Sequence, residues 1–179
     1  MVDFFKCPQD WLDFFYKDDV NPFVDEKNDY EPFYLIPYHK VNVVILVSDK
    51  TKKEYTYSKE YLSKSFQNIY KELENEGFHP VKDGNIKHWY KNGILFFDTE
   101  SVNKELLNKI VCFLLEKKDI IWLILSDDKD DKKDIYNTII EKSNTVFRKN
   151  PMDKSFYNSS IFKKIDNILK TQKNDPIPW

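Results

Sequence analysis

Two carboxylate side chains follow short apolar segments, at the places where strands of a sheet would end. Asp49 comes after Val43–Val47 and the intervening Ser48, and Asp98 comes after Ile94–Phe97. A carboxylate within hydrogen-bond reach of a water molecule can act as a general base, and it can accept a hydrogen bond from an amine. Aspartate at such a position also caps turns and helices, so a catalytic and a structural interpretation are both open.

The elements that must position these residues alternate between apolar segments and amphipathic helices. Strands are expected at Val43–Val47, Ile94–Phe97, Ile120–Leu125 and Thr145–Phe147, helices at Asp10–Tyr16, Lys59–Glu76, Ser101–Lys117, Asp127–Lys142 and Ser159–Leu169, and an irregular segment at Asn21–Tyr38. We therefore expect a single domain over residues 1–179, a three-layer α/β/α sandwich with a four-stranded, mainly parallel sheet. In such folds ligands bind beyond the carboxyl ends of the strands.

Two helix boundaries carry local signals. Gly77 is expected to end the helix at Lys59–Glu76, because glycine readily adopts the left-handed conformation of a helix end. Ser126 is expected to cap Asp127–Lys142. The charged run Ser126–Lys133 lacks the central glycine and terminal glutamate of a calcium loop, so it predicts a solvated first helical turn.

The charge composition argues against a strong nucleic-acid binder. The 179 residues carry 28 Lys+Arg against 30 Asp+Glu, and Arg148 is the single arginine. Arginine is the usual bidentate reader of phosphate and guanine, and a net charge of −2 gives no long-range attraction to DNA. We therefore expect weak DNA binding or none. The chain contains no alanine and avoids residues with GC-rich codons, which indicates an AT-rich genome.

The cysteines, histidines and apolar runs indicate whether the protein binds a metal and whether it contacts a membrane. Cys7 and Cys112 are far apart and there are 3 histidines, so no zinc-ligand spacing exists, and we expect neither metal nor cofactor. The longest apolar runs, Val43–Val47 and Ile120–Leu125, are too short to cross a bilayer. The chain starts without a basic region followed by an apolar stretch. We therefore expect an intracellular protein without membrane contact.

Several stretches, taken in order, resemble the uracil-DNA glycosylases of family 1. These stretches are Ser65–Glu74, Gly77–Pro80, Gly84–Ile86 with Trp89, Gly93–Thr99, Ser155–Tyr157 and the terminal Pro176–Trp179. The resemblance runs from about Trp11 to Trp179, nearly the whole chain, and it implies the same α/β/α fold. It also implies an ancestry in DNA repair.

The resemblance assigns roles to several residues near the strand ends. Asp49 stands where the family has the carboxylate that activates water, and Ser48 stands beside it. Tyr55 or Tyr57 would take the place of the phenylalanine that stacks on uracil. Asp98 stands where the family has the asparagine that reads uracil. A carboxylate repels uracil O4 but accepts from the exocyclic amine of cytosine, so an intact pocket would favour an amine-bearing base.

Other family motifs are shortened or replaced. The loops after Asp49 and Thr99 are shorter than in the family, and the segment Phe147–Lys154 contains no histidine where the family has a catalytic one. Lys149 could supply positive charge there, and Met152 is the apolar candidate for the residue that wedges into DNA. Tyr157 is expected near the same face.

These features leave three functions open. The first is a catalytically degenerate member that binds a protein or DNA partner, as some viral members do in replication processivity. The second is an active DNA base glycosylase with altered base preference, using Asp49 and Asp98. The third is simply a stable intracellular domain with an unrelated binding role. We expect an unidentified protein partner to dock beside Tyr55, Tyr57, Met152 and Tyr157. A rival docking surface is the aromatic N-terminal segment with Phe4, Phe5, Trp11, Phe14 and Phe15.

Overall fold

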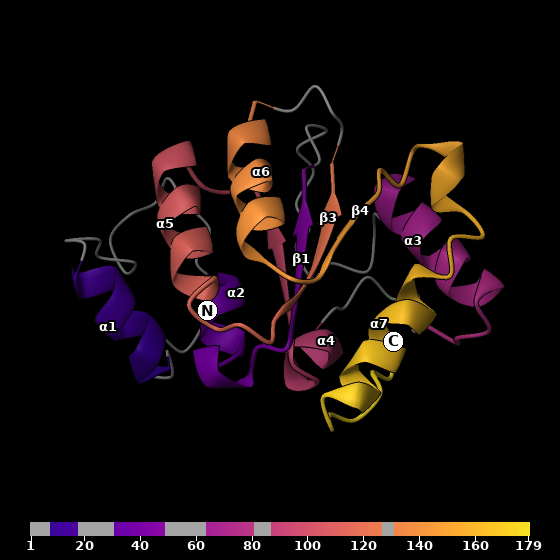
Figure 1. The fold of residues 1–179 in the computed structure, drawn as a ribbon, viewed down its shortest axis with the longest axis horizontal. Helices are drawn as coiled ribbons and strands as arrows, with labels where there is room; N and C mark the ends of the chain where they lie inside the picture. The colour runs from indigo at the N-terminus through magenta and orange to yellow at the C-terminus, as the bar shows by residue number, and fades with distance from the viewer. Residues whose placement is uncertain (1–7, 18–30, 49–63, 81–86, 127–130) are drawn as a thin grey trace.

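A computed structural model describes residues 8–17, 31–48, 64–80, 87–126 and 131–179 of the chain. Its centre is a four-stranded sheet between two layers of helices (Figure 1). The strands are β1 (Val43–Val47), β2 (Ile94–Asp98), β3 (Ile121–Leu125) and β4 (Val146–Arg148), in the order β2-β1-β3-β4. Each neighbouring pair is parallel, so the predicted α/β/α architecture with a parallel sheet is confirmed.

Helices cover both faces of this sheet. They are α1 (Gln9–Lys17), α2 (Glu31–Leu35), α3 (Lys64–Asn75), α4 (Lys87–Lys91), α5 (Lys104–Leu114), α6 (Lys133–Lys142) and α7 (Ile161–Thr171), with 3-10 turns η2 (Tyr38–Lys40) and η3 (Lys154–Phe156). The pair α5 and α6 lies on one face and the pair α3 and α7 on the other, while α1 lies outside α5 (Figure 1). No helix within the described ranges is long and apolar enough to span a membrane.

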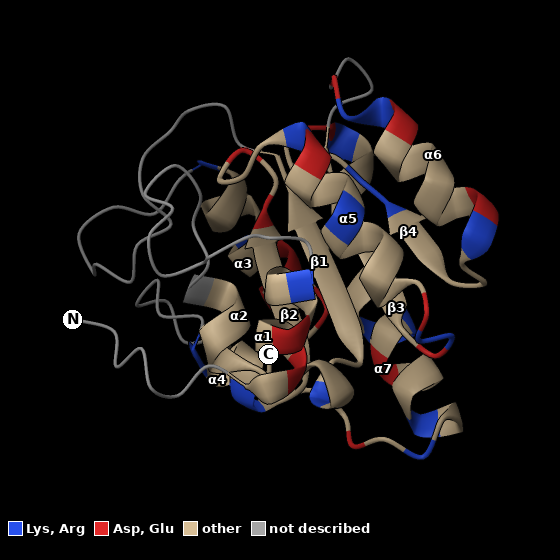
Figure 2. Cartoon of the chain, turned by 90° about the vertical axis from the view of Figure 1, so that its left-hand side faces the viewer, with Lys and Arg blue, Asp and Glu red and all other residues tan. Residues whose placement is uncertain are grey.

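The two central strands are apolar along their whole length because both of their faces are covered. Every residue of β1 and β3 is buried, and charged residues gather on the helices and near the strand ends (Figure 2). Val47 is in register with both Asp98 and Leu125, so the ends of these strands meet at one edge. The chain leaves β1 toward β2 and leaves β3 toward β4, which makes the gap between β1 and β3 the topological switch point.

Two predicted helix starts were wrong: the chain turns after β2 before α5 begins, and residues 131–132 form a turn before α6 begins. Helix α5 begins at Lys104, after Asn103 accepts a hydrogen bond from the amide of Leu106 at 2.8 Å. Helix α6 begins at Lys133 with Lys132 as its N-terminal flanking residue, so Ser126 is not its cap. Residues 127–130 lie outside the described part of the chain.

The segment predicted as irregular, Asn21–Tyr38, contains helix α2 in its described part. Pro32 is tolerated because it occupies the first turn, where its missing N–H has no intrahelical partner. Phe33 and Ile36 are fully buried, so packing outweighs the local proline signal. The boundary signal of Gly77 is confirmed: its φ is +86°, and the next amide, that of Phe78, donates back into the helix.

Three of the four aromatic side chains of α1, those of Trp11, Phe14 and Phe15, pack into or against the core. Trp11 and Phe15 are buried, and the indole of Trp11 donates to the carbonyl of Ile36 at 2.8 Å. The ring of Phe14 stacks on Phe113 of α5 with centroids 4.6 Å apart. Core packing therefore takes up the described members of the rival docking surface, while Phe4 and Phe5 lie outside the described residues.

Candidate functional site

The carboxyl edge of the sheet brings Ser48 and Asp98 to the ends of neighbouring strands. Both side chains are partly buried. The backbone continues the strand pairing past this point, because the amide of Ser48 donates to Leu125 at 3.1 Å and that of Thr99 donates to Val47 at 2.8 Å. The predicted placement of Ser48 and Asp98 at the strand ends is therefore found. Asp49, Tyr55 and Tyr57 lie outside the described residues, so their roles stay predictions.

The carboxylate of Asp98 caps the turn that follows β2. Its Oδ1 accepts from the backbone amide of Glu100 at 2.9 Å, and its carbonyl accepts from the Ser101 hydroxyl at 2.5 Å. This is the turn-capping role that aspartate commonly has at the end of a strand. The turn directs the next acidic side chain, that of Glu100, along the carboxyl edge.

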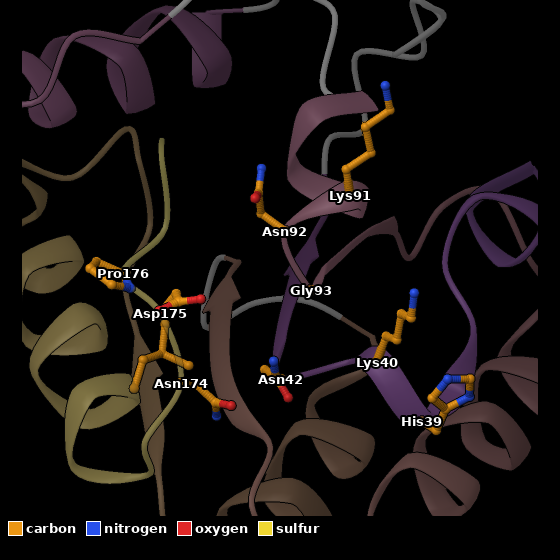
Figure 3. Close-up of a pocket in the computed structure, with 10 residues that line it drawn as sticks. His39, Lys40, Asn42, Lys91, Asn92, Gly93, Asn174, Asp175 and Pro176 are labelled. Atoms are coloured by element: carbon orange, nitrogen blue, oxygen red, sulfur yellow. The ribbon is translucent and has the colours of Figure 1, made fainter.

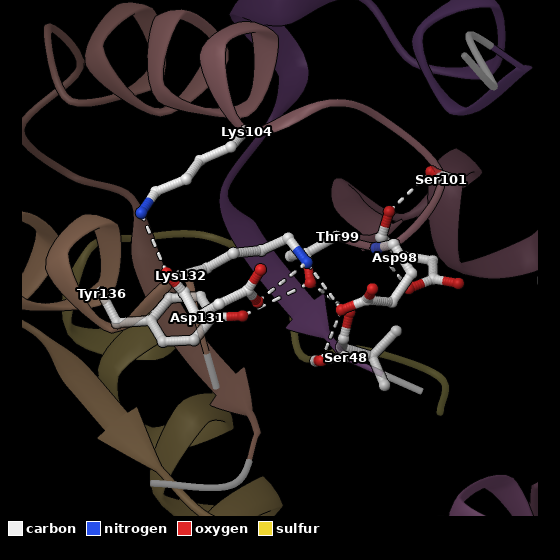
Figure 4. Close-up of polar contacts among 10 residues, drawn as sticks. Ser48, Asp98, Thr99, Ser101, Lys104, Asp131, Lys132 and Tyr136 are labelled. Atoms are coloured by element: carbon white, nitrogen blue, oxygen red, sulfur yellow. Dashed lines mark hydrogen bonds and ion pairs between the residues drawn. The ribbon is translucent and has the colours of Figure 1, made fainter. Parts of the chain in front are cut away.

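Glu100 joins three elements through one carboxylate oxygen. Its Oε1 accepts from the Ser48 hydroxyl at 2.9 Å and from the Lys132 ammonium at 2.6 Å (Figure 4). The side chain of Lys132 is 6% exposed and that of Glu100 is 20% exposed, so this is a largely buried ion pair. Such a pair is retained only where further hydrogen bonds satisfy the charges, and Ser48 supplies one. We call Ser48, Glu100 and Lys132 the edge cluster.

A second lysine holds the segment that carries Lys132. The ammonium of Lys104 donates to the carbonyl of Asp131 at 2.9 Å and pairs with the carboxylate of Asp134 at 2.9 Å. The hydrogen bond from Lys104 lowers the pKa of Asp134 below its usual value. Helix α5 thereby fixes the start of α6, and with it the position of Lys132.

Further polar side chains lie buried beneath the edge cluster. The hydroxyl of Thr99 donates to the carbonyl of Val47 at 3.1 Å and lies 3.3 Å from the hydroxyl of the buried Tyr136. Ser126, at the end of β3, is also buried. Buried polar groups are usually satisfied by hydrogen bonds. The carboxyl ends of the central strands are therefore covered by buried polar side chains that bond to one another and to the backbone.

Glu100 and Lys132 were missed by the sequence analysis. Lys132 falls in the run predicted to be a solvated helical turn, yet it is buried. Its partner lies 32 residues away in the sequence, so no local pattern predicts the pair. The one available signal was position, because each residue lies in a segment that follows the carboxyl end of a strand.

The predicted contact residues Lys149 and Met152 lie in the turn between β4 and η3. Met152 is 59% exposed, and its amide donates to the side chain of Asn150 at 2.8 Å. The buried carboxamide of Asn68, from α3, donates to the carbonyl of Pro151 at 2.9 Å. The turn therefore presents an exposed apolar side chain on a fixed backbone.

Tyr157 lies beyond η3, on the side of α3. Its ring is partly buried, and the ammonium of Lys71 lies 5.3 Å from the ring centroid. The turn with Met152 follows β4, and Ser48 follows β1. Strand β3 lies between these two strands, and neighbouring strands are about 4.8 Å apart, so β4 is roughly 10 Å from β1. The predicted residues thus form two groups, one at the centre of the carboxyl edge and one at its side.

Among the described residues, no group of three or more His, Cys, Asp and Glu side chains could hold a metal ion.

No protein-family model matches the chain. Curated proteins named uracil-DNA glycosylase are similar to it. The one from Mycoplasmopsis pulmonis is 28% identical over 217 positions, covering 96% of this chain and 97% of that protein.

Two further relatives carry the same name. The uracil-DNA glycosylase of Mesomycoplasma hyopneumoniae is 27% identical over 164 positions, covering 80% of this chain and 70% of that protein. The one from Lacticaseibacillus casei is 24% identical, covering 84% of this chain and 76% of that protein. The match to the Mycoplasmopsis protein spans 217 positions against 179 residues here, so at least 38 positions have no counterpart in this chain.

Proposed function

This chain belongs to the uracil-DNA glycosylase superfamily, and from that premise we propose that it is a member that does not excise uracil and acts by binding a partner protein. The observation that carries the proposal is the edge cluster. An excising enzyme needs polar groups at the strand ends that can turn to a flipped base. Here the charges of Glu100 and Lys132 satisfy each other at 2.6 Å.

The chemistry of Asp98 supports the same proposal. Uracil needs a partner that donates to O4 as well as one that accepts from N3, and a carboxylate only accepts. One oxygen of Asp98 already accepts from the amide of Glu100. Excision also expels a uracil anion, which a donor must stabilise, and the segment Phe147–Lys154 has no histidine to do so.

The length of the chain is a third support. The match to the Mycoplasmopsis protein spans more positions than this chain has residues, and we infer that some of the unmatched positions fall in the loops after Asp49 and Thr99. Loops at strand ends carry the functional side chains in folds of this class. Shortening several of them together removes more of a catalytic site than a single substitution does.

The binding role rests on the turn between β4 and η3. Met152 is one of three large hydrophobic side chains exposed in the described part of the chain, beside Tyr16 and Ile140. It stands on a turn fixed by Asn150 and Asn68, so little backbone entropy is lost when it is covered. A protein suits this surface better than DNA does, because the chain has a net charge of −2 and a single arginine.

A second candidate is a glycosylase that acts on an amine-bearing base such as cytosine. The observation in its favour is the register of Asp98 with Val47, which sets this carboxylate beside the strand that leads to Asp49. In this reading Asp98 accepts from the exocyclic amine and Asp49 activates water.

The experiment for excision uses single- and double-stranded oligonucleotides that carry one uracil or one unpaired cytosine, followed by alkali. We expect no strand breaks with either base. Breaks at uracil that vanish in Asp49→Asn would contradict the proposal. Breaks at cytosine that vanish in both Asp49→Asn and Asp98→Asn would establish the second candidate instead.

The experiment for binding uses affinity capture by the purified chain with matched variants. Met152→Glu should remove the captured partner protein, whereas Ile140→Glu, a change of the same kind on α6, should leave it bound. DNA is tested separately by fluorescence anisotropy, where we expect weak binding and a shallow salt slope, since each phosphate contact adds only about one unit. Tight, steeply salt-dependent DNA binding lost in Lys149→Gln would replace the protein by DNA as partner.

A further inference from the structure

A cavity of about 410 Å³ lies at the amino edge of the sheet, opposite the edge cluster. Three segments build it: η2, the turn between α4 and β2, and the segment after α7 (Figure 3). Its polar side chains include Lys40, Asn42, Lys91, Asn92, Asn174 and Asp175. Strand β1 has 5 residues at about 3.3 Å each, so the cavity is roughly 17 Å from the carboxyl edge.

Opposite charges line different walls of this cavity. Lys40 and Lys91 come from η2 and α4, and Asp175 comes from the C-terminal segment (Figure 3). Within the described ranges, the ammonium groups of Lys40 and Lys91 make no ion pair or hydrogen bond. The carboxylate of Asp175 makes none there either. A ligand that is anionic at one end and donates hydrogen bonds at the other would satisfy both walls.

Carboxamide side chains also line the cavity. Asn42, Asn92 and Asn174 can each donate and accept, as the edge of a heterocyclic base does. The side-chain Nδ2 of Asn92 donates to the carbonyl of His88 at 2.7 Å, which fixes the orientation of that side chain. The volume lies within the usual range for small-molecule sites.

Two walls are fixed before any ligand binds. The ammonium of the partly buried Lys117 donates to the carbonyls of Val41 at 2.5 Å and His39 at 3.0 Å, which anchors η2. Gly93 has a φ of +85°, and a Cβ there would lie 3.0 Å from both the Asn42 amide nitrogen and the Lys40 carbonyl. Only glycine brings the two walls this close without strain.

The third wall is held by the end of the chain. The buried carboxylate of Asp166 accepts from the indole of Trp179 at 3.1 Å and from the amide of Ile177 at 3.3 Å. The ring of Trp179 packs on Phe162 with centroids 4.9 Å apart. These contacts hold the preceding Asp175 in place. A site whose walls are already ordered loses less entropy on binding.

We propose that this cavity binds a nucleoside 5′-monophosphate, with the phosphate on Lys40 and Lys91, the base edge on the asparagine carboxamides and a sugar hydroxyl on Asp175. The same chemistry occurs in a free nucleotide and at the 5′-phosphorylated end of a DNA strand. The site is independent of the carboxyl edge and makes no use of the edge cluster.

Isothermal titration of the full chain tests this site with four probes: deoxynucleoside 5′-monophosphates, the matching nucleosides, inorganic phosphate and a 5′-phosphorylated trinucleotide. We expect nucleotides to bind at least about tenfold more tightly than nucleosides or phosphate alone, because each charged contact contributes about one such factor. Lys40→Gln with Lys91→Gln should weaken nucleotide binding by about tenfold or more, and Asp175→Asn by less. Lys142→Gln, an exposed lysine on α6, is the matched control.

The outcomes distinguish a free nucleotide from a DNA strand end as the ligand, and they also show whether the proposed site fails. Tighter binding of the trinucleotide identifies a strand end, and tighter binding of the mononucleotide identifies a free nucleotide, and both support the site. Absence of nucleotide binding, equal binding of nucleoside and nucleotide, equal binding of phosphate alone, or unchanged binding in the double lysine variant would each overturn the proposal. Lys40, Lys91 and Asp175 are exposed, so a wild-type melting temperature in the variants excludes unfolding as the cause of a loss.

Discussion

The two edges of the sheet use the same kinds of side chain in opposite ways. At the carboxyl edge Lys132 is buried and pairs with Glu100 at 2.6 Å. At the amino edge Lys40, Lys91 and Asp175 line a cavity and do not pair with one another. Charges that satisfy each other hold a fold together, whereas charges kept apart by ordered walls are available to a ligand. The resemblance to uracil-DNA glycosylases assigns catalysis to the carboxyl edge. In this chain the Glu100–Lys132 ion pair lies at that edge.

Removing the lysine of the edge cluster should have the largest effect. Lys132→Met leaves the Glu100 carboxylate desolvated without its cation, which should cost about 3 kcal/mol in the free energy of unfolding. Urea unfolding measures this cost. The control is Lys133→Met, the next residue and an exposed one, which should change the free energy by less than about 0.5 kcal/mol. Equal effects of the two changes would show that Lys132 contributes as a surface residue does.

The serine of the edge cluster should have a smaller effect. Ser48→Ala removes a hydrogen bond to the charged Glu100, so the expected loss is about 1.5 kcal/mol in the free energy of unfolding. Ser101→Ala is a useful comparison, since that hydroxyl donates to a backbone carbonyl and should contribute about 1 kcal/mol. A loss for Ser48→Ala no larger than that for Ser101→Ala would show that the hydrogen bond to Glu100 contributes no more than one to a neutral carbonyl.

Much of the fold followed from continuous apolar segments, which is why all four strands were predicted within a residue or two. The boundaries that were missed, before α5 and α6, depend on side chains that reach distant partners or cap a turn. The location of Ser48 and Asp98 at the strand ends was predicted from position, whereas the roles assigned to them came from the family resemblance and stay predictions. Glu100 and Lys132 were not predicted, because the burial of a charge is decided by a partner far along the chain.

The anchor of the amino edge should show a pH dependence. Burial raises the pKa of Asp166 above its ordinary value of 3.8. The folded state therefore binds the proton more tightly than the unfolded state, and stability falls as the pH rises from 3.8 through the raised pKa. Asp166→Asn keeps an acceptor for Trp179 but does not ionise, so its stability should fall less over this window.

Thermal unfolding across that pH window makes the comparison. Asp175→Asn is the control, because this exposed carboxylate lies on the same segment. If wild type and Asp166→Asn show the same slope, Asp166 does not contribute to it, and the wall of the cavity is not held by a buried ionisable group.

The smallest effect on stability is expected where charges do not pair. Lys40→Gln combined with Lys91→Gln should change the free energy of unfolding by less than about 0.5 kcal/mol, because exposed side chains without partners contribute little. Chemical denaturation without ligand measures this. A loss as large as that of Lys132→Met would mean that both edges are structural.

A double-mutant cycle between Lys132 and Glu100 tests most directly whether the carboxyl edge is held by charges that satisfy each other. The cycle compares the free energies of unfolding of wild type, Lys132→Met, Glu100→Gln and the double variant. We expect a favourable coupling of about 2 kcal/mol or more, with the double variant more stable than the sum of the single changes implies. A coupling near zero would contradict it, because Glu100 and Lys132 would then be independent groups still available to a substrate.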